Sequence, residues 1–455
     1  DTIFALASGA GVSGVAIIRL SGEQSFKTVA DLTRSSLSSP RSAVLRKFFA
    51  KSGKILDEGL VIRFPSPASF TGEDVAELHV HGGIATVDAM LNALAAFDGL
   101  RLAEPGEFTR RAFENGKLDL TSVEALSDLI AAETEAQRLQ ALRQLGGDFG
   151  KQCDLWRDEL IGVLANLEAW IDFPEEDLPD DLLKETKHKI LCFINIISQY
   201  IDQNKVGERI RSGFSIAIIG PPNAGKSSLL NFFAGRDAAI VSNEAGTTRD
   251  VVEVKCSIGG LPVTFSDTAG LRQSMDQVEA EGVKRALAVS AEADLQILVR
   301  APDCPELDDP KFRGVADDGR PPCLKLWNKS DLGASPVSQH LSISLKTGMN
   351  CDKLVEELEG HLQRMLPREG SAPLTRRRHR EALENCLAHL ERAGEGSEIE
   401  LIAEDIRMSA RALGKITGRV DVEDILDRLF NEFCISLIHL SQHTDIINPE
   451  FLNTS

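Results

Sequence analysis

Residues that can hold a polyphosphate occur together in one short run of the chain. The sequence Gly220-Pro-Pro-Asn-Ala-Gly-Lys-Ser227 follows the apolar segment 214–219 and precedes leucines that favour a helix. Its glycines let backbone N–H groups surround the phosphates, Lys226 supplies a cation to the outer phosphates, and the hydroxyl of Ser227 can bind Mg²⁺. Alone, this strand, loop and helix indicates a nucleotide site but leaves ATP, GTP and a chance match open.

Two later segments indicate that the base is guanine. Asp267-Thr-Ala-Gly270 ends one apolar strand, and Asn328-Lys-Ser-Asp331 ends another. The carboxylate of Asp331 can accept hydrogen bonds from N1–H and the exocyclic amine of guanine, a pair that adenine does not offer. Because each unpaired buried polar group costs roughly 1–3 kcal/mol, we expect the site to reject ATP.

Between the phosphate loop and Asp267 lies Gly246-Thr-Thr-Arg-Asp250, from which we choose Thr248 as a second Mg²⁺ ligand. A threonine in such a loop is about equally often a turn or a cap residue. Ser344-Leu-Lys346 fits a further loop that closes over the base. The complete set of predicted GTP-binding residues is Asn223, Ala224, Gly225, Lys226, Ser227, Ser228, Ser242, Asn243, Glu244, Ala245, Gly246, Thr247, Thr248, Asp267, Thr268, Ala269, Gly270, Asn328, Lys329, Asp331, Ser344, Leu345 and Lys346.

The residue that follows Gly270 is Leu271. Ras-like enzymes carry a glutamine there, which orients the attacking water, and leucine cannot do this. A working hydrolase of this sequence therefore needs another group for the water and another positive charge for the transition state. Such a charge contributes about 10³–10⁵ in rate when an arginine supplies it.

The composition is that of a soluble globular protein with more than one domain. The chain has 455 residues, of which 42% are hydrophobic and 26% charged, and this length predicts two to three domains. A net charge of −19 argues against a generally cationic nucleic-acid coat, although it permits a local basic patch. Eight scattered cysteines without zinc-ligand spacing predict reduced thiols and a cytoplasmic protein. No apolar stretch approaches the roughly 20 residues of a membrane span, so we expect no membrane partner.

The pattern of the sequence changes along the chain and predicts four segments and a tail. Residues 1–117 mix short apolar runs with turn residues, which suits an α+β domain. Residues 118–212 and 373–440 show helical periodicity, whereas residues 213–366 alternate strands and helices. We therefore predict a discontinuous helical domain that is split by an inserted Ras-like P-loop domain. Residues 441–455 have no clear period and are expected to form a mobile tail.

Beyond the nucleotide motifs, the sequence resembles one family over nearly its whole length: MnmE, also called TrmE, the bacterial and organellar tRNA-modification GTPases. So many unrelated segments in the right order make a chance similarity implausible. The segments that carry the resemblance are Ser69–Val75, His81–Gly83, Pro105–Phe108, Lys117–Leu120, Ile171–Pro174, Gly246–Asp250 and Phe433–Ile435.

The resemblance implies how hydrolysis proceeds without a glutamine after Gly270. Family members use K⁺ in place of an arginine finger, because a cation near the leaving oxygens supplies charge where it develops. Glu279 is implied to orient the water, and with Lys226 it is a predicted catalytic residue. From the residues alone, Asn223 would be a turn residue and Glu279 a solvated carboxylate on a charged helix. The implied K⁺ contacts, mostly backbone oxygens, are Asn223, Ser242, Glu244 and Thr247.

The resemblance also implies a second site and several partners. The amino-terminal domains form a homodimer that binds 5-formyltetrahydrofolate or a related one-carbon folate through Arg19, Glu77 and Lys117. Their charges can pair with oxygens and amines of a folate, although each residue alone is more often a surface charge. With the flavin-dependent partner MnmG (GidA), the family adds a carboxymethylaminomethyl-type group to the wobble uridine of tRNA. The cluster Arg376–Arg380 is a candidate phosphate contact for tRNA or the partner.

The end of the chain departs from the family pattern. Family members end in Phe-Cys-Ile-Gly-Lys, whereas this chain reads Phe433-Cys-Ile-Ser-Leu437 and continues to Ser455. We predict Cys434 as a catalytic thiol, which would act as a nucleophile if its pKa were lowered. The alternative is that Cys434 is a small buried apolar residue.

Two functions stay open from the sequence, beside a third possibility that the altered end leaves a GTPase that dimerises but fails at modification. The first is an enzyme, a K⁺-stimulated GTPase whose cycle drives tRNA modification. The contrasting function is a GTP-switched RNA-binding or ribosome-assembly module, in which hydrolysis only times release. The block Ser69–Leu120 favours the enzyme, because an assembly factor would not need it.

Overall fold

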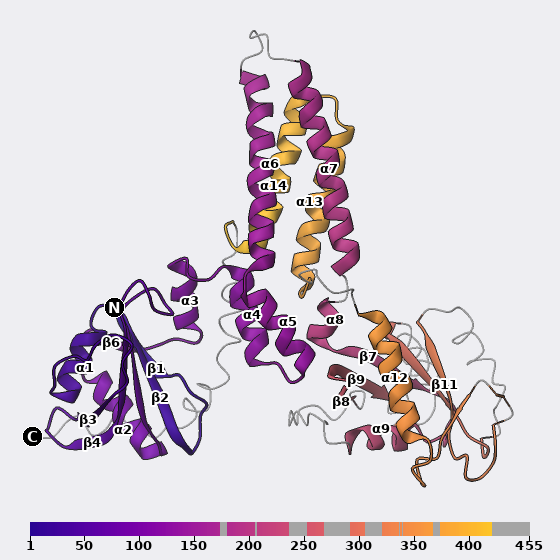
Figure 1. Cartoon of the computed structure of the whole chain (residues 1–455), viewed down its shortest axis with the longest axis horizontal. Coiled ribbons are helices and arrows are strands. Elements are labelled where there is room, and N and C mark those ends of the chain that lie inside the picture. Colours follow the sequence, from indigo (N-terminus) through magenta and orange to yellow (C-terminus); the bar gives the residue numbers. More distant parts are fainter. Residues whose placement is uncertain are drawn as a thin grey trace, which may run out of the picture. The chain divides into compact units, whose positions relative to one another are not determined.

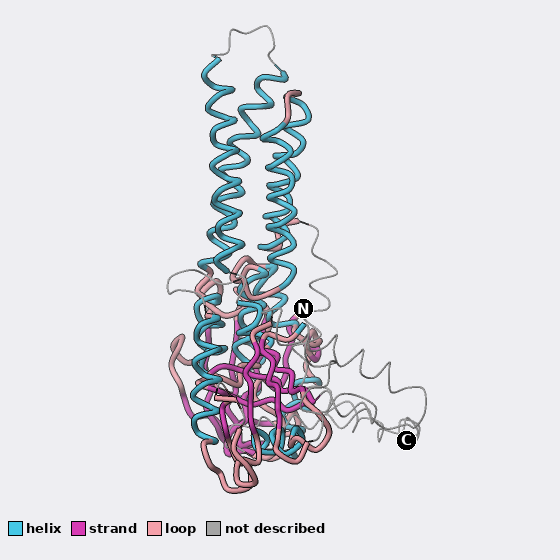
Figure 2. The backbone as a smooth tube through the Cα atoms, turned by 90° about the vertical axis from the view of Figure 1, so that its right-hand side faces the viewer, coloured by secondary structure: helices cyan, strands magenta, loops and turns pink. Residues whose placement is uncertain are grey.

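The chain divides into two compact units, Asp1–Ser127 with Gly414–Ser455, and Asp128–Leu413. Figures 1 and 2 trace the helices and strands of both units. The computed structural model describes residues 1–172, 180–204, 207–235, 253–267, 292–304, 321–335, 337–338, 340–366 and 374–420.

The first unit is built on a six-stranded sheet in the order β3-β4-β5-β2-β1-β6. Neighbouring strands pair antiparallel except β1 and β6, which are parallel. The helices α1 and α2 share one buried core with the sheet. The elements are β1 (Thr2–Leu6), β2 (Ser13–Ser21), α1 (Ser25–Thr33), β3 (Val44–Phe49), β4 (Ile55–Phe64), β5 (Val75–Gly82), α2 (Ile84–Ala95), β6 (Leu100–Leu102), α3 (Glu107–Glu114) and α4 (Leu120–Ile130).

Strand alternation separates this core from a polar strip on the opposite face of the sheet. Ile18 and Leu20 of β2 and Leu78 of β5 are fully buried in the core shared with α1 and α2. Because successive side chains of a strand point to opposite faces, Arg19 and Glu77 lie on the other face. The register of β2 and β5 places Arg19 opposite Glu77, so two residues 58 positions apart become neighbours.

In the second unit, helices from both sides of the nucleotide-binding segment lie together (Figure 2). The helix α13 packs on α7, and the rings of Phe149, Tyr200 and His379 meet where α6, α7 and α13 come together. The predicted discontinuous helical domain is therefore confirmed. Its helices are α5 (Glu135–Leu145), α6 (Asp148–Asp172), α7 (Asp180–Asn204), α13 (Arg377–Glu395) and α14 (Ile399–Thr417).

The inserted segment forms a second six-stranded sheet, in the order β12-β11-β10-β7-β9-β8. All neighbouring pairs are parallel except β8 and β9. Its buried strands read as nearly continuous apolar runs, as expected for a parallel sheet. The elements are α8 (Gly207–Ser212), β7 (Phe214–Ile219), α9 (Lys226–Ala234), β8 (Glu253–Ile258), β9 (Leu261–Asp267), β10 (Leu295–Arg300), β11 (Cys323–Trp327), β12 (Leu341–Ser342) and α12 (Cys351–Met365).

The parallel pairing decides where the nucleotide motifs meet. In such sheets ligands bind outside the carboxyl ends of the strands. The phosphate loop follows β7, Asp267 ends β9, and Asn328 follows β11, so all three lie at the same edge. The predicted P-loop domain is thus confirmed as a fold, with each motif directly at the end of a strand.

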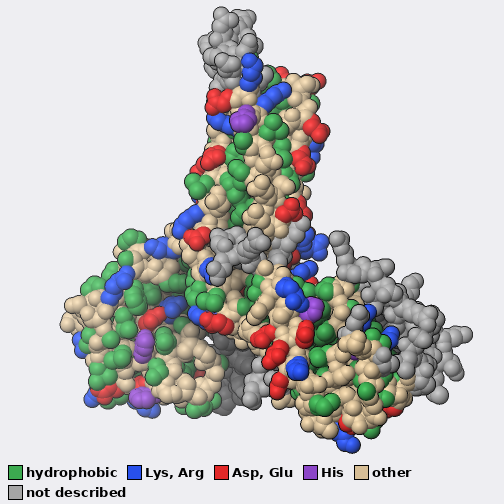
Figure 3. Space-filling model, turned by 45° about the vertical axis from the view of Figure 1, so that its right-hand side comes forward, with side chains coloured by type: hydrophobic (Ala, Val, Ile, Leu, Met, Phe, Trp, Pro, Cys, Tyr) green, Lys and Arg blue, Asp and Glu red, His purple; other side chains and the backbone are tan. Residues whose placement is uncertain are grey.

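Charged side chains of both signs are mixed over the helices. On the face drawn in Figure 3, Lys and Arg alternate with Asp and Glu instead of forming a single basic patch. None of the described helices is long and apolar enough to cross a bilayer.

Candidate functional site

The phosphate loop is shaped by two glycines that no other residue could replace without a clash. A side-chain carbon on Gly220 would lie 2.2 Å from the carbonyl oxygen of Val299. A side-chain carbon on Gly225 would lie 2.2 Å from the amide nitrogen of Asn328. Both glycines have positive φ, and so does Asn223 between them, at 62°. The loop therefore curls tightly at the start of α9, where backbone N–H groups can face an anion.

Lys226 is held inside this loop. It is 7% exposed, and its Nζ donates hydrogen bonds to the carbonyl oxygens of Gly220 and Pro221, at 2.9 and 2.8 Å. The cation is consequently fixed at the first turn of α9 before any phosphate arrives. Ser227 follows it on the same turn, as the predicted Mg²⁺ ligand requires.

Asn328 joins the base-binding segment to the phosphate loop. Its buried Nδ2 donates to the carbonyl of Ala224 at 3.1 Å, and its Oδ1 accepts from the N–H of Leu345 at 3.4 Å. The Oδ1 atom of Asp331 accepts from the hydroxyl of Ser344 at 2.6 Å. These bonds orient the predicted guanine acceptor and draw three separate segments into one site.

Two residues beside the site were missed by sequence reasoning. Asp303 accepts a hydrogen bond from Lys329 Nζ at 2.6 Å, and this bond lowers the pKa of Asp303. The thiol of Cys304 donates to the carbonyl of Pro222 at 3.4 Å, and burial raises the pKa of that thiol. Their only signal in the sequence is a position shortly after the apolar strand β10.

Three more of the predicted residues lie on or beside the elements that surround the phosphate loop. Ala224 is buried and Ser228 is an exposed residue of α9. Asp267 pairs with Ile218 through the β7 and β9 main chains. The predictions for Ser242, Asn243, Glu244, Ala245, Gly246, Thr247, Thr248, Thr268, Ala269, Gly270, Glu279 and Cys434 fall outside the described residues.

The polar strip of the amino-terminal sheet forms a second candidate site. Arg19 donates from Nε and Nη2 to Oε1 of Glu77, at 3.0 and 2.8 Å. The rings of Phe70 and Phe108 lie 5.3 and 5.7 Å from the Arg19 guanidinium carbon, within the range of a cation–π contact. Two of the three predicted folate residues are therefore in direct contact, between two aromatic rings.

The same strip contains an unsatisfied nitrogen. His79 Nε2 is buried, has no hydrogen-bond partner among the described residues, and lies 3.6 Å from Oε2 of Glu77. The third predicted residue, Lys117, donates to the carbonyl of Pro67 at 2.9 Å, on the loop that leads to Phe70. Sequence reasoning missed His79, although its spacing of two from Glu77 in a strand predicts the same face.

The arginine cluster at the start of α13 is engaged within the second unit. Arg376 pairs with Asp128 at 2.8 Å, and Arg380 pairs with Glu208 of α8 at 2.9 Å. Arg377 pairs with Glu381 one turn further along α13. These ion pairs give the cluster a role in holding helices together, and contact with tRNA stays a prediction.

The short helix α8, which precedes β7, is bonded at both ends. Gln140 Nε2 donates to the carbonyl of Gly207 and Gln137 Nε2 to that of Arg211, each at 3.0 Å. Arg209 of α8 pairs with Asp294 at 2.7 Å, and Asp294 also accepts from the N–H of Ser215 at 3.0 Å. The entrance to the nucleotide-binding sheet is thus fixed to the helix α5 and to the start of β10.

Comparison with known proteins gives matches over both units. The family model described as the MnmE helical domain matches residues 120–434, and the model of the GTP-binding protein TrmE N-terminus matches residues 2–117. The tRNA modification GTPase MnmE of Parvibaculum lavamentivorans is 51% identical over 446 residues, covering 96% of this chain and 99% of that protein. The proteins of the same name from Paramagnetospirillum magneticum and Granulibacter bethesdensis are 50% and 47% identical, with the same coverage.

Proposed function

The chain belongs to the MnmE family of tRNA modification GTPases, and from this premise we propose how its two sites divide the reaction. It is a GTP hydrolase that acts in tRNA modification. We propose that K⁺ supports the hydrolysis step, and that a folate in the amino-terminal site supplies a one-carbon unit. With a flavin-dependent partner of the MnmG type, the chain then adds a carboxymethylaminomethyl-type group to the wobble uridine of tRNA.

The observation that carries the nucleotide part is the double role of Asn328. Because this side chain bonds to both Ala224 and Leu345, the phosphate loop and the base-binding loop are assembled before a ligand enters. Such preorganisation reduces the ordering that binding requires. Asp331, held by Ser344, is then available for the two N–H donors of guanine.

The potassium part is supported by the phosphate loop and by Leu271. A leucine cannot orient the attacking water, so the site needs another group for the water and another positive charge for the transition state. Asn223 has a left-handed backbone conformation within the loop, and its amide oxygen is a hard ligand of the type that K⁺ takes. Bound there, K⁺ would supply positive charge near the leaving oxygens, while Ser227 and Thr248 would hold Mg²⁺.

Steady-state GTP hydrolysis in KCl and in NaCl tests this part. At equal ionic strength we expect hydrolysis to be about 10²-fold faster in KCl, the size of one transition-state contact. Asn223→Ala should remove the difference, whereas Asn231→Ala on the exposed side of α9 should keep it. Equal rates in both salts would refute the potassium requirement and leave GTP hydrolysis itself in place.

The folate part is supported by the polar atoms of the amino-terminal strip. Glu77 uses Oε1 for Arg19, and its Oε2 lies 3.6 Å from His79 Nε2, which has no hydrogen-bond partner among the described residues. The amino and ring N–H groups of a pterin can donate to the carboxylate of Glu77, and Lys117 offers a cation to carbonyl or carboxylate oxygens. Calorimetric titration of the full chain with 5-formyltetrahydrofolate tests this assignment, and absence of binding would refute it.

The homodimer is proposed to form through the same face of the amino-terminal sheet. Leu45 and Leu60 lie opposite one another in β3 and β4 and are 57% and 38% exposed. Leu60 is also opposite His79, so this apolar area adjoins the polar strip. Sedimentation should find a dimer with and without nucleotide, and Leu45→Glu combined with Leu60→Glu should give monomers. A dimer that survives both changes would place the interface elsewhere.

A further inference from the structure

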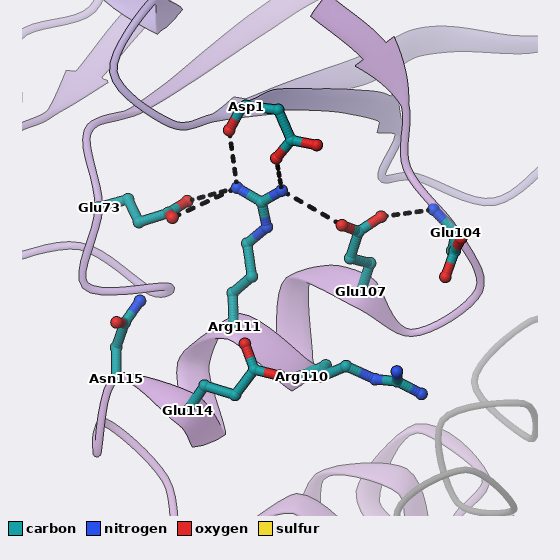
Figure 4. Close-up of a pocket in the computed structure, with 8 residues that line it drawn as sticks. All are labelled: Asp1, Glu73, Glu104, Glu107, Arg110, Arg111, Glu114 and Asn115. Carbon is teal, nitrogen blue, oxygen red and sulfur yellow. Dashed lines mark hydrogen bonds and ion pairs between the residues drawn. The ribbon is translucent and has the colours of Figure 1, made fainter.

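Arg111 lies outside the amino-terminal strip but is bonded to the segments that form its walls. It sits on the middle of α3 with its side chain 11% exposed. Figure 4 shows its guanidinium among three acidic residues. It donates from Nη2 to Asp1 at 2.7 Å and to Glu107 at 3.2 Å, and from Nη1 to Glu73 at 3.1 Å. These partners are the residue directly before β1, a residue of α3 itself and a residue of the loop before β5.

One side of the strip is formed by α3 and by the residues that follow it. Phe108, whose ring lies beside Arg19, is in the first turn of this helix. Lys117 follows its end and is tied to the last turn, because its N–H donates to the carbonyl of Ala112 at 2.8 Å. The placing of both the ring and the lysine therefore depends on how α3 is held against the sheet.

The second wall is the loop that carries Phe70. Glu73 of this loop accepts from the hydroxyl of Ser21 at 2.7 Å, and Ser21 shares a buried hydrogen bond of 2.6 Å with Thr71. Ser21 is two residues after Arg19 on β2, so it lies on the same face of the sheet. The loop is thereby fixed beside Arg19, and Glu73 is also bonded to Arg111.

The two walls are joined again at the end of α3. Asn115 Nδ2 donates to the carbonyl of Thr71 at 2.8 Å, and Lys117 Nζ donates to the carbonyl of Pro67. Arg111 is the charged centre of this assembly, and the planar fork of its guanidinium can serve several carboxylates at once. Lysine has the same charge but cannot reproduce that geometry.

We propose that Arg111 is a positioning residue for the folate, which acts by holding α3 and the Phe70 loop at the distance that the ligand requires. The proposal rests on the folate site proposed above. Within the described part of the chain Arg111 has no hydrogen bond or ion pair with Arg19 or Glu77, and its effect on the ligand passes through Phe108, Lys117 and Phe70.

The test is calorimetric binding of 5-formyltetrahydrofolate to the full chain carrying Arg111→Lys. We expect the dissociation constant to rise about tenfold, because a displacement of α3 by a fraction of an ångström weakens several contacts to the folate together. Arg46→Lys is the matched control, since within the described residues the one hydrogen bond of Arg46 goes to the neighbouring carbonyl of Leu45, and the folate affinity of this variant should be unchanged. GTP hydrolysis by each variant, expected to stay at the wild-type rate, shows that the effect is confined to the folate site.

A double-mutant cycle separates positioning from general stabilisation. If Arg111 acts through Lys117, then Arg111→Lys should cost clearly less affinity in a Lys117→Met background than in the wild type. Ser21→Ala breaks the link from Glu73 to Thr71 without changing any charge, and it should weaken the folate several-fold in the same non-additive way.

Each outcome has a distinct meaning. Wild-type affinity in Arg111→Lys and in Ser21→Ala, or losses that add fully with Lys117→Met, would overturn the positioning role while the folate site stands. Failure of the wild-type chain to bind would overturn the folate site and this proposal with it. A tenfold loss that is non-additive with Lys117→Met would support both.

Discussion

The nucleotide site and the amino-terminal strip are built in opposite ways. The phosphate-binding part of the nucleotide site is one continuous loop, whose shape comes from Gly220, Gly225 and backbone carbonyls that hold Lys226. The strip is assembled from side chains of β2, β5, a loop and α3, with Arg19 and Glu77 at its centre. A site made from one loop carries its own geometry. A site made from four elements depends on the residues that hold those elements together.

This difference predicts which changes stay local. Substitutions in the phosphate loop should abolish one activity and leave folate binding intact. Substitutions far from the strip, such as those at Arg111, should still reach the folate.

The largest expected effect is that of Lys226→Ala. Removing the buried cation that faces the phosphates should lower the rate of GTP hydrolysis about 10³-fold, as loss of a major transition-state contact does. Steady-state phosphate release measures this, and folate titration of the same variant should give the wild-type affinity. Hydrolysis within tenfold of wild type, or lost folate binding, would contradict the separation of the two sites.

The next effect concerns the base. Asp331→Asn should weaken GTP about 10²-fold, because two N–H donors of guanine lose a charged acceptor. Xanthosine triphosphate carries a carbonyl where guanine carries its amine, so it should bind the variant better than GTP does. Competition of the two nucleotides checks this reversal. Ser330→Ala, a change next to Asp331, serves as the control and should keep the preference for GTP.

A smaller effect is expected for Glu77→Gln in the strip. The loss of one charge-assisted pair with Arg19 should weaken 5-formyltetrahydrofolate about tenfold and leave the rate of GTP hydrolysis unchanged. Glu58→Gln, at an exposed position of β4, is the control. If the two variants bind folate equally, Glu77 has no part in the site.

The smallest expected effect is a pH dependence of the local stability of the segment around α3. Burial alone would raise the pKa of Glu107, but hydrogen bonds from Arg101, from the N–H of Glu104 and from Arg111 outweigh it and lower that pKa. A lowered pKa stabilises the fold above the ordinary carboxyl value, and this stabilisation disappears as pH falls through the lower folded value.

Hydrogen exchange of α3 amides between pH 6 and pH 3, corrected for intrinsic rates, measures this loss. We expect about 1.5 kcal/mol less protection at the acid end, the lower end of the range for one hydrogen bond to a charged group. Glu107→Gln should flatten the profile, whereas an unchanged profile would show that the carboxylate is not responsible.

The same contrast explains what could be predicted from the sequence. The phosphate loop and its position after β7 were predicted and confirmed, because a contiguous motif needs no knowledge of distant contacts. The split of the helical domain was also predicted, since helical periodicity resumes after the inserted sheet. Arg19 and Glu77 came only from the family resemblance, because their contact depends on strand register between β2 and β5.

Residues that act through contacts between distant segments could not be recognised from the amino-acid sequence. Nothing in the local sequence distinguishes Arg111 from its neighbour Arg110, and only the fold brings Asp1 and Glu73 to it. Phe70 was likewise recognisable only after the placement of its loop was known, whereas His79 had a signal, its spacing of two from Glu77 in a strand. The roles predicted for Glu279, Cys434 and all the K⁺ ligands stay predictions, and of these residues only Asn223 lies within the described part of the chain.

The helix α8 has a consequence for excising the nucleotide-binding domain. By sequence that domain begins at Gly213, but Asp294 at the start of β10 is bonded to Arg209, and both ends of α8 are bonded to glutamines of α5. A fragment cut at Gly213 would lose a charged partner of its own sheet. A fragment that begins at Gly207 would keep it and still leave two carbonyls to be hydrated. The domain boundary that the sequence predicts, Gly213, therefore lies six residues after Gly207, the boundary that keeps the stabilising contacts of α8 with the sheet.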